Sequence, residues 1–459
     1  MTAGAPTPRR SGLLTWLLSW IYFAERVGQP RGLDVLFFTE MWERFSYYGM
    51  RGFLILYLTA AVTGGGLGFD DRHAAHVYAL YVSSVWLTPI LGGFIADRLL
   101  GQYRSVLAGG TVIALGHFTL AFKALGSFYA GLVLIVLGTG LLKPNVSTLV
   151  GSLYDQSDQR RDAGFSLFYM GINVGAFLGI TAAGALAQKV DWHLGFAAAG
   201  VGMTCGLIQY VLGKRRLQPA LDRLAAPPPS AGAPLTPAPS RIRLSAVEGK
   251  RIAAVFVLFI FAALFWGAYE QAGSTLNLFA DRYTRLGVFG FTVPSSWLQS
   301  VQPIFVILLA PVMAWLWVRL GPREPSSPAK FALALLCAGV AFLLLVPAAA
   351  IAQSGAGVKV SPLWLIVAYF IEELGELCLS PVGLSAVTKL APPRLVGRLM
   401  GVFFLSNWLG NLLAGWTAGF FTSLPLGTLF ATVAGVCLAA ALAMFLLIKP
   451  VQNLMGGVH

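Results

Sequence analysis

Charged residues are scarce in this chain of 459 residues. Asp, Glu, Lys and Arg make up 11% of it, whereas hydrophobic residues make up 57% and the mean hydropathy is +0.73. An average soluble domain carries about 25% charged residues, so this composition argues against a water-soluble fold. Cysteine is scarce as well, and Cys205, Cys337, Cys378 and Cys437 lie far apart inside apolar stretches. Without a C-x-x-C pair or metal-ligand spacing, we expect these cysteines to pack between helices.

Acidic residues are rarer than basic ones, with 19 Asp and Glu against 32 Lys and Arg, for a formal net charge of +13. A basic balance can indicate nucleic-acid binding. Here, however, the basic residues lie in short loops between apolar runs, where they set orientation in a membrane, and we exclude a nucleic-acid partner. The loops with basic residues alternate, which predicts that they and both termini are cytoplasmic: Arg98 and Arg104, Arg160 and Arg161, Lys214 to Arg216, Arg319 and Arg323, Arg394 and Arg398.

Apolar runs of about 20 residues, each long enough to cross a hydrocarbon core of ~30 Å, fill most of the chain. They predict an all-α polytopic membrane protein with twelve transmembrane helices in two groups of six. The first group covers residues 34–62, 73–98, 103–123, 127–152, 161–187 and 192–213, and the second covers 249–271, 293–320, 328–352, 361–389, 396–421 and 425–448.

A Pro- and Ala-rich break separates the two groups, and its composition predicts an extended, unpacked tether. Two six-helix halves joined by a cytoplasmic tether are typical of the major facilitator fold, although a twelve-helix channel or scaffold also fits. We expect five segments: a cytoplasmic N-terminal segment without a cleavable signal peptide (1–33), an N-terminal bundle (34–213), the basic tether (214–250), a C-terminal bundle (251–448) and a cytoplasmic tail (449–459).

Ionisable residues occur inside the predicted spans, where each one costs about 2.5–3.5 kcal/mol and therefore indicates a function or a partner. In the first span each of Glu40, Glu43, Arg44, Tyr47 and Arg51 lies three or four residues from another member of the set, which places them on one face of a helix. Four charges on one face exceed what helix packing requires. Further such residues are Lys143, Glu270, Glu372, Glu373 and Glu376, and structural ion pairs are an equally good interpretation for Glu372 and Glu373.

The motifs around these residues resemble those of one family. The run from Glu40 to Gly49 is similar to the E-x-x-E-R-F-x-Y-Y-G signature of the proton-dependent oligopeptide transporters, a branch of the major facilitators. Other blocks follow in the family's order and extend the resemblance from Gly28 to about Leu447, apart from the tether: Gly138 to Tyr154, Phe165 to Gly175, Phe265 to Ser274 and Gly375 to Ser385. The loop Gly93-x-x-x-Asp97-Arg98-x-x-Gly101 is similar to the general facilitator loop between the second and third helices.

The resemblance implies a proton-coupling set in the first half and at its junction with the second. Glu40, Glu43 and Arg44 would form a buried charge network with Lys143, and its protonation would decide which ion pairs survive. Arg51 and Glu270 come from opposite halves, and in the family this pair closes one side of the pathway. Protonation of the glutamate would then release the arginine.

The resemblance also implies a substrate site. Arg44 and Lys143 suit the carboxylate end of a peptide, whereas Glu376 and Asn173 would hold its amino end. Tyr47, Tyr48 and Trp266 offer amphipathic walls, with ordinary helix packing as the alternative. At the remaining candidate positions this chain departs from the family pattern. Trp86 replaces the family's tyrosine, Gln302 an asparagine, Phe403 a tryptophan and Asn407 a smaller hydroxyl residue.

These observations predict a proton-coupled symporter that imports di- and tripeptides or peptide-like zwitterions by alternating access. A modified amino acid, a drug-like zwitterion or an anion such as nitrate could be the cargo instead, and a peptide sensor or scaffold without transport is the third possibility. We expect no enzyme activity, because neither a nucleophile–base pair nor a metal-binding cluster is evident, and no cofactor beyond the proton gradient. The expected partners are protons, a small peptide and membrane lipids. We expect the protein to be a monomer in the inner (plasma) membrane.

Overall fold

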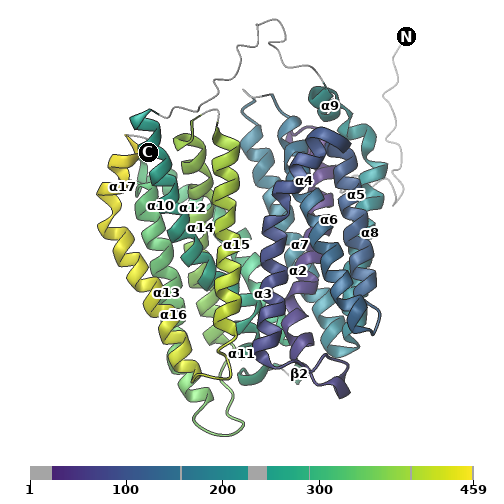
Figure 1. The fold of residues 1–459 in the computed structure, drawn as a ribbon, viewed down its shortest axis with the longest axis vertical. Coiled ribbons are helices and arrows are strands. Elements are labelled where there is room, and N and C mark those ends of the chain that lie inside the picture. The colour runs from purple at the N-terminus through teal and green to yellow at the C-terminus, as the bar shows by residue number, and fades with distance from the viewer. Residues whose placement is uncertain (1–22, 156–157, 226–244, 289, 393–394, 457–459) are drawn as a thin grey trace, which may run out of the picture.

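The protein consists of two helical bundles that lie side by side, coloured purple to teal and green to yellow in Figure 1. The computed structural model describes residues 23–155, 158–225, 245–288, 290–392 and 395–456. Several expectations therefore fall outside the described residues, namely those for residues 1–22, for the Pro-rich centre of the tether at 226–244, for Arg394 and for the last three residues of the tail.

The N-terminal bundle is built from six membrane-length segments in chain order. The helices α3 (Asp71–Leu87) and α4 (Pro89–Ile95) form one segment that breaks at Pro89, which lacks the N–H needed to continue the first helix and instead begins the second. The short 3-10 turns Ala24–Val27 and Val62–Gly64 flank the first helix. The elements are α2 (Gly32–Thr59), α3 (Asp71–Leu87) with α4 (Pro89–Ile95) and a π turn (Ala96–Leu100), α5 (Gln102–Leu120), α6 (Leu125–Ser152), α7 (Arg161–Lys189) and α8 (Trp192–Leu212).

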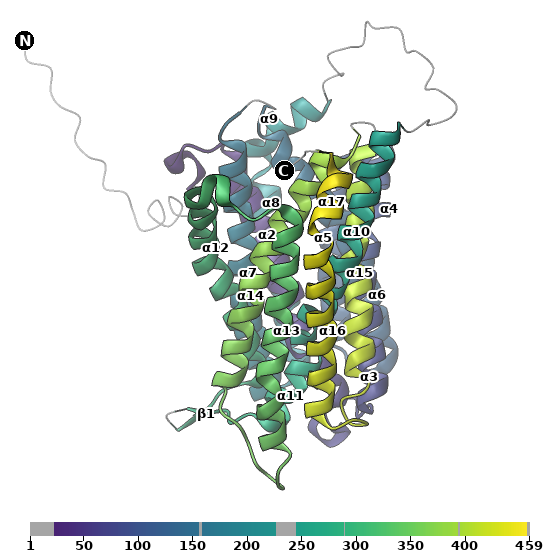
Figure 2. The ribbon, with the colours of Figure 1, turned by 90° about the vertical axis from the view of Figure 1, so that its left-hand side faces the viewer.

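The C-terminal bundle repeats this plan, and its first segment bends at the 3-10 turn Glu270–Gly273. The two strands β1 (Gly287–Val288) and β2 (Phe291–Thr292) pair as an antiparallel hairpin at one end of the molecule (Figure 2). The helices are α10 (Ala246–Tyr269), α11 (Thr275–Tyr283), α12 (Val301–Leu320) after the 3-10 turn Ser295–Ser300 and before the turn Gly321–Arg323, α13 (Ser327–Ala352), α14 (Leu363–Leu390), α15 (Val396–Ala418), α16 (Leu426–Leu446) and α17 (Ile448–Met455).

Within the described residues, nine segments are long and apolar enough to cross a membrane by length and composition. Three further long helices, α2, α5 and α14, complete the bundles; α2 and α14 contain the buried charged residues that make them less apolar. The fold is thus an all-α membrane protein of twelve spans in two six-helix bundles, which confirms the predicted fold class.

Close packing of α2 against α7 fixes the position of the charged face of α2. Gly175 of α7 lies against the backbone of Met41, and a Cβ there would overlap the Met41 carbonyl oxygen. At Gly49 an added Cβ would come within 3.0 Å of the carbonyl oxygen of Gly179. The absence of side chains at these positions allows the two backbones to approach, as small residues do between membrane helices.

The expected extended tether is wrong for its first part, because Lys214–Ala225 form the helix α9. Leu217 and Ala220 are fully buried, and Leu217 packs against Gly32 at the start of α2. Arg216 also forms an ion pair with Asp34, with 2.7 Å between Nη2 and Oδ2. Apolar contacts and this ion pair outweigh the helix-breaking tendency of Pro219 inside the helix. In Figure 1 α9 lies at the top of the N-terminal bundle.

Candidate functional site

Arg44 is the centre of the charged cluster on α2. Its Nε lies 3.1 Å from Oε1 of Glu40 and also forms an ion pair with Glu43, and all three residues are buried. One buried polar atom of each remains without a hydrogen-bond partner, namely Glu40 Oε2, Glu43 Oε1 and Arg44 Nη2. The cluster can therefore accept a further proton or a ligand without breaking all of its present contacts, which a saturated structural network could not.

Lys143 on α6 approaches the same cluster but is not paired with it. Its Nζ lies 3.3 Å from the centroid of the Trp86 ring, a cation–π contact. Among the described residues Lys143 forms no ion pair, although it lies within electrostatic range of Glu40, Glu43 and Arg44. The sequence predicts Lys143 as a direct member of the charge network, and in this conformation Trp86 holds it instead.

Arg51 and Glu270 join the two bundles. They form the inter-bundle ion pair that the resemblance implies, and both side chains are buried. Arg51 also donates from Nε to the hydroxyl of Tyr78 on α3, at 2.8 Å. The Tyr78 hydroxyl in turn lies against Gly273, where a Cβ would overlap it. Glycine at this position lets α3 and the 3-10 turn behind Glu270 close around the pair.

A second set of polar contacts continues this closure away from α9. Asp71 at the start of α3 accepts two hydrogen bonds from Arg282 at the end of α11, each at 2.6 Å. The backbone carbonyl of Gly52 on α2 accepts from Asn277 Nδ2 at 2.8 Å and from Gln299 Nε2 at 3.1 Å. The bundles are thus joined through buried and partly buried hydrogen bonds at the end of the molecule opposite α9.

The acidic residues of α14 lie beside tyrosines from two other helices. Tyr269 of α10 donates to Oε1 of Glu373 at 2.8 Å. Glu376 lies next to the hydroxyl of Tyr169 on α7, so this contact crosses between the bundles. Asn173, one turn further along α7, donates from Nδ2 to the Tyr169 carbonyl at 3.1 Å. Tyr169 therefore connects the two residues that the sequence assigns to the amino end of a substrate.

The glutamates of α14 have no cationic partner in the described part of the chain. Glu372 is buried with both carboxyl oxygens unpartnered, and one oxygen each of Glu373 and Glu376 is unpartnered as well. The ion-pair interpretation of Glu372 and Glu373 is therefore wrong for the described residues. An unpaired carboxyl group buried in a membrane helix is costly, which sets α14 apart from the other helices of its bundle.

The remaining predicted positions differ in their surroundings. Trp266 packs edge-to-face on Tyr269, and its Nε1 has no hydrogen-bond partner. Gln302 Nε2 and Asn407 Oδ1 are also buried and unpartnered. Phe403 instead packs tightly against Gly383 of α14, where a Cβ would lie 2.6 Å from its ring. Tyr47 and Tyr48 lie beside Arg44, with its Cζ 5.3 and 5.9 Å from their ring centroids.

The sequence-based assignment misses seven side chains that form these contacts: Tyr78, Asp71, Arg282, Asn277, Gln299, Tyr169 and Tyr269. Asp71 and Arg282 stand at helix ends, where a charge is common and therefore gives no signal. Asp71 and Tyr78 are seven residues apart on one helix face, which could have indicated a polar face on α3. Within the described residues, no three His, Cys, Asp or Glu side chains are grouped as they would be to hold a metal ion.

Two six-helix bundles joined across a seam of buried charges define a transporter of the major facilitator type. A family model described as "POT family" matches residues 103–220 and 242–447. The chain therefore belongs to the POT family, the proton-dependent oligopeptide transporters.

Individual relatives agree with this placement over nearly the whole chain. The chain is 40% identical to an uncharacterized transporter, YclF, of Bacillus subtilis, with 94% of this chain and 96% of the relative covered. It is 38% identical to the peptide transporter YePEPT of Yersinia enterocolitica, with the same coverage. Among solved structures, a mutant of the peptide transporter POT in complex with alafosfalin superposes with a TM-score of 0.85 at 39% identity, covering 94% of this chain and 96% of that one.

Proposed function

We propose that this protein is a proton-coupled symporter that imports di- and tripeptides or peptide-like zwitterions by alternating access. The observation that carries the proposal is the ion pair between Arg51 and Glu270, which joins the two bundles through a group that can be protonated. A contact of this kind links the closure of one side of a transport pathway to the binding of a proton. The peptide-transporting relative YePEPT supports the same activity.

The distribution of charge suits a zwitterionic substrate. Arg44 and Lys143 are basic groups of the N-terminal bundle, and Glu376 is an unpaired acid of the C-terminal bundle. A substrate with a carboxylate at one end and an ammonium at the other would satisfy both bundles at once. Arginine is able to bind the carboxylate through two parallel hydrogen bonds, and binding would draw the bundles together independently of the substrate's side chains.

Proton coupling follows from competition for Arg51. While Glu270 is ionised, it holds Arg51 and keeps the end opposite α9 closed. A proton on Glu270 removes one charge of the pair and weakens the hold on Arg51, which keeps its hydrogen bond to Tyr78, so that the bundles separate more easily at this end. Glu40 and Glu43 hold Arg44 in the same way, so that a proton on either one would loosen this hold and make the guanidinium more available to the substrate carboxylate.

The proposed orientation places α9 and the loops with basic residues in the cytoplasm, following the positive-inside rule. The closed end then faces outward. We propose residence in the inner (plasma) membrane as a monomer, with both termini cytoplasmic and with the proton gradient as the only energy source.

A non-peptide zwitterion is the second candidate cargo, and the contact between Trp86 and Lys143 favours it. Trp86 holds the lysine amine against its ring, which limits the reach of Lys143 toward a long substrate. A short zwitterion bound mainly by Arg44 would depend less on that lysine. A non-transporting peptide sensor is less consistent with the site, because a receptor does not require a buried ion pair between its two bundles.

Purified protein in proteoliposomes tests the proposal. An inward proton gradient with an interior-negative potential should drive accumulation of radiolabelled dialanine above its external concentration, and a proton ionophore should abolish accumulation. A panel of dipeptides, tripeptides and short zwitterions is then tested for inhibition of dialanine uptake, which ranks these compounds as substrates. If no zwitterion of the panel accumulates or competes while the protein remains folded, the proposed function is wrong.

A further inference from the structure

One short turn of the C-terminal bundle contacts two helices of the N-terminal bundle. The turn Ser295–Ser300 precedes α12, and its Gln299 donates to the backbone carbonyl of Gly52 on α2. The same turn also lies along the last part of α7, at the end of the molecule opposite α9. None of the residues that form this second contact belongs to the predicted proton-coupling or substrate site.

The contact with α7 involves one face of that helix. Thr181 and Gln188 are seven residues apart, which places them on the same face. The carbonyl of Thr181 accepts from Trp297 Nε1 at 2.9 Å. Gln188 donates from Nε2 to Ser295 Oγ at 2.7 Å, and its Oε1 accepts from the backbone N–H of Ser296 at 3.1 Å. Consecutive residues of the turn therefore bind to this face of α7 through three hydrogen bonds.

Gly184 lies on the same face of α7 and allows the turn to approach. A Cβ at this position would lie 2.4 Å from Ser296 Oγ and 3.3 Å from Ser296 Cβ. Ser296 is fully buried, and its hydroxyl has no hydrogen-bond partner. The two bundles are thus in direct contact here, and a side chain at Gly184 would require Ser296 to move.

The hydrogen bonds between α7 and the turn are made by neutral groups. Ser295 Oγ donates to Asp281 Oδ1 of its own bundle at 2.8 Å, which leaves the hydroxyl oxygen to accept from Gln188. The other charged neighbour is Lys189, whose Nζ lies 5.3 Å from the centroid of the Phe291 ring. The bonds that cross between the bundles join amide, hydroxyl, indole and backbone groups, and none of these gains or loses a proton near neutral pH.

We infer that the contact between α7 and the turn Ser295–Ser300 is a latch that holds this end closed independently of protonation, with Gln188 as its positioning residue. The inference rests on the proposed transport cycle, in which a proton on Glu270 weakens the hold on Arg51. The latch contains no group that this proton changes, so it still opposes separation of the bundles after the proton has bound. The latch therefore sets how often this end opens, whereas Arg51 and Glu270 make the opening depend on a proton.

A cysteine at position 296 measures opening of the latch without transport. Ser296→Cys replaces a buried, unpartnered hydroxyl with a thiol, in protein whose four native cysteines are changed to Ala. A water-soluble methanethiosulfonate reaches this position only when α7 and the turn separate. Gln188→Leu removes two hydrogen bonds, and we expect it to raise the labelling rate about tenfold. Gln188→Glu keeps the acceptor and loses the donor, so it should raise the rate less.

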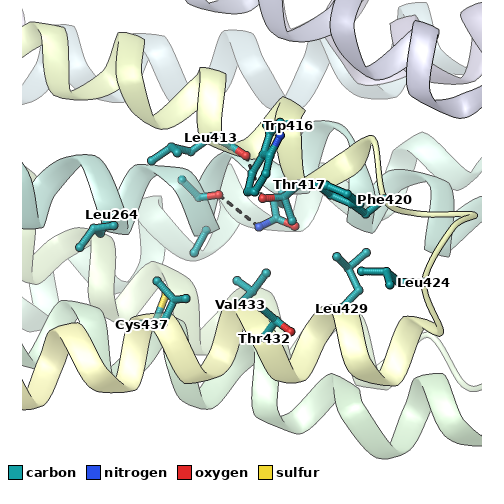
Figure 3. A pocket seen from close by; sticks show the side chains of 14 residues that line it. Leu264, Leu413, Trp416, Thr417, Phe420, Leu424, Leu429, Thr432, Val433 and Cys437 are labelled. Atoms are coloured by element: carbon teal, nitrogen blue, oxygen red, sulfur yellow. Dashed lines mark hydrogen bonds between the residues drawn. The ribbon is translucent and has the colours of Figure 1, made fainter.

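A native cysteine provides the matched control for general loosening of the fold. Cys437, labelled in Figure 3, is buried and lines a cavity of about 300 Å³ whose lining residues all belong to the C-terminal bundle. In protein that retains Cys437 as its only cysteine, Gln188→Leu should leave the labelling rate unchanged. Equal labelling at position 296 with and without Gln188→Leu, or a parallel rise at Cys437, would overturn the latch whether or not the protein transports peptides.

Independence from the proton is tested by combining two variants in the protein with Ser296→Cys. Glu270→Gln resembles the protonated gate residue and should itself raise labelling at position 296. Because the latch shares no atom with the pair of Arg51 and Glu270, Gln188→Leu should raise the rate by the same factor with and without Glu270→Gln. If the effect of Gln188→Leu disappears in Glu270→Gln, the latch is not independent of the proton and the inference is wrong.

A reversible crosslink distinguishes a latch from a contact that stays closed throughout transport. The 3.3 Å between a Cβ at Gly184 and the Cβ of Ser296 is close to the separation of about 3.5–4.5 Å in disulfides. In the cysteine-free protein, Gly184→Cys with Ser296→Cys should crosslink on oxidation. Oxidation should abolish dialanine uptake, and dithiothreitol should restore it. Undiminished uptake by fully crosslinked protein, or a folded double variant that does not crosslink, would contradict the latch.

The labelling experiment decides the inference where the crosslink does not. If Gly184→Cys prevents folding, the labelling rates of the single reporter at position 296 remain the test, because that protein keeps Gly184. If wild type accumulates no dialanine, the proposed function is wrong, whereas the labelling rates still show whether Gln188 holds α7 against the turn. A rate at position 296 that rises with Gln188→Leu while the rate at Cys437 stays constant is the result that the latch predicts.

Discussion

Asp71 and Arg282 form a two-bond clasp between the first helix hairpin of one bundle and the first long segment of the other. Nη1 and Nη2 of Arg282 donate to Oδ2 and Oδ1 of Asp71, each at 2.6 Å. Asp71 is buried, whereas the Arg282 side chain is about one-third exposed. The clasp continues the closure made by Arg51 and Glu270 but lies closer to the end of the molecule.

We expect Asp71→Asn to weaken this clasp without uncoupling transport. Loss of the charge removes a bidentate ion pair and shifts the bundles toward separation at this end, while Arg51 and Glu270 remain intact. Uptake of dialanine should fall several-fold but should still require a proton gradient. Loss of the gradient requirement in Asp71→Asn would contradict the separate roles of the two pairs.

A charge reversal provides the matched control for that experiment. Asp71→Arg combined with Arg282→Asp restores opposite charges in the same place, and we expect the double variant to recover part of the uptake that either single variant loses. Additive losses in the double-mutant cycle would show that the two side chains are not coupled.

The cation–π contact between Trp86 and Lys143 leads to a prediction about which peptide lengths the protein binds. Trp86→Tyr with Gln302→Asn should release Lys143 from the larger ring and shorten the amide, so the binding of tripeptides should improve relative to dipeptides. Thermal shifts across a panel of both, in wild type and double variant, measure the change. Phe403 is left unchanged because its ring packs closely against Gly383. Identical profiles would mean that these positions do not set selectivity.

The helix α9 should contribute to stability despite its place in the linker. Leu217→Ala removes a fully buried side chain against Gly32 and should cost about 2–5 kcal/mol, as such truncations do in packed cores. Gln218→Ala, at an exposed position of the same helix, is the control and should have little effect. The melting temperatures of both variants are measured in the same detergent, and Leu217→Ala should melt at the lower temperature. Equal melting temperatures would mean that α9 does not stabilise the fold.

The sequence predicts the helical architecture well because each membrane span can be recognised from its own residues. A run of about 20 apolar residues needs no distant contact to be recognised, and the charges on α2 are conspicuous because they interrupt such a run. The face shared by Glu40, Glu43 and Arg44 follows from helix geometry alone. The pair between Arg51 and Glu270 comes from the family resemblance and could not follow from spacing, since 219 positions separate the two residues.

Other features depend on distant contacts and on competing local signals. Asp71 and Arg282 are 211 positions apart, and either one alone reads as an ordinary charge at a helix end. The helix α9 is obscured by the Pro-rich composition around it. Leu217, Leu221 and Leu224 nevertheless recur at i, i+4 and i+7, a spacing that predicts an amphipathic helix. The contact of Lys143 with Trp86 instead of with the glutamates depends on side-chain packing that sequence spacing does not contain.

The central claim is that the ion pair between Arg51 and Glu270 both closes the pathway and carries the coupling proton. Proteoliposomes with wild-type protein, Glu43→Gln or Glu270→Gln measure it directly, through uphill uptake of dialanine under a proton gradient and through counterflow exchange without one. We predict that wild type performs both, whereas both variants lose uphill uptake and retain part of the exchange, which requires no net proton movement. Full uphill uptake by Glu270→Gln would contradict the account.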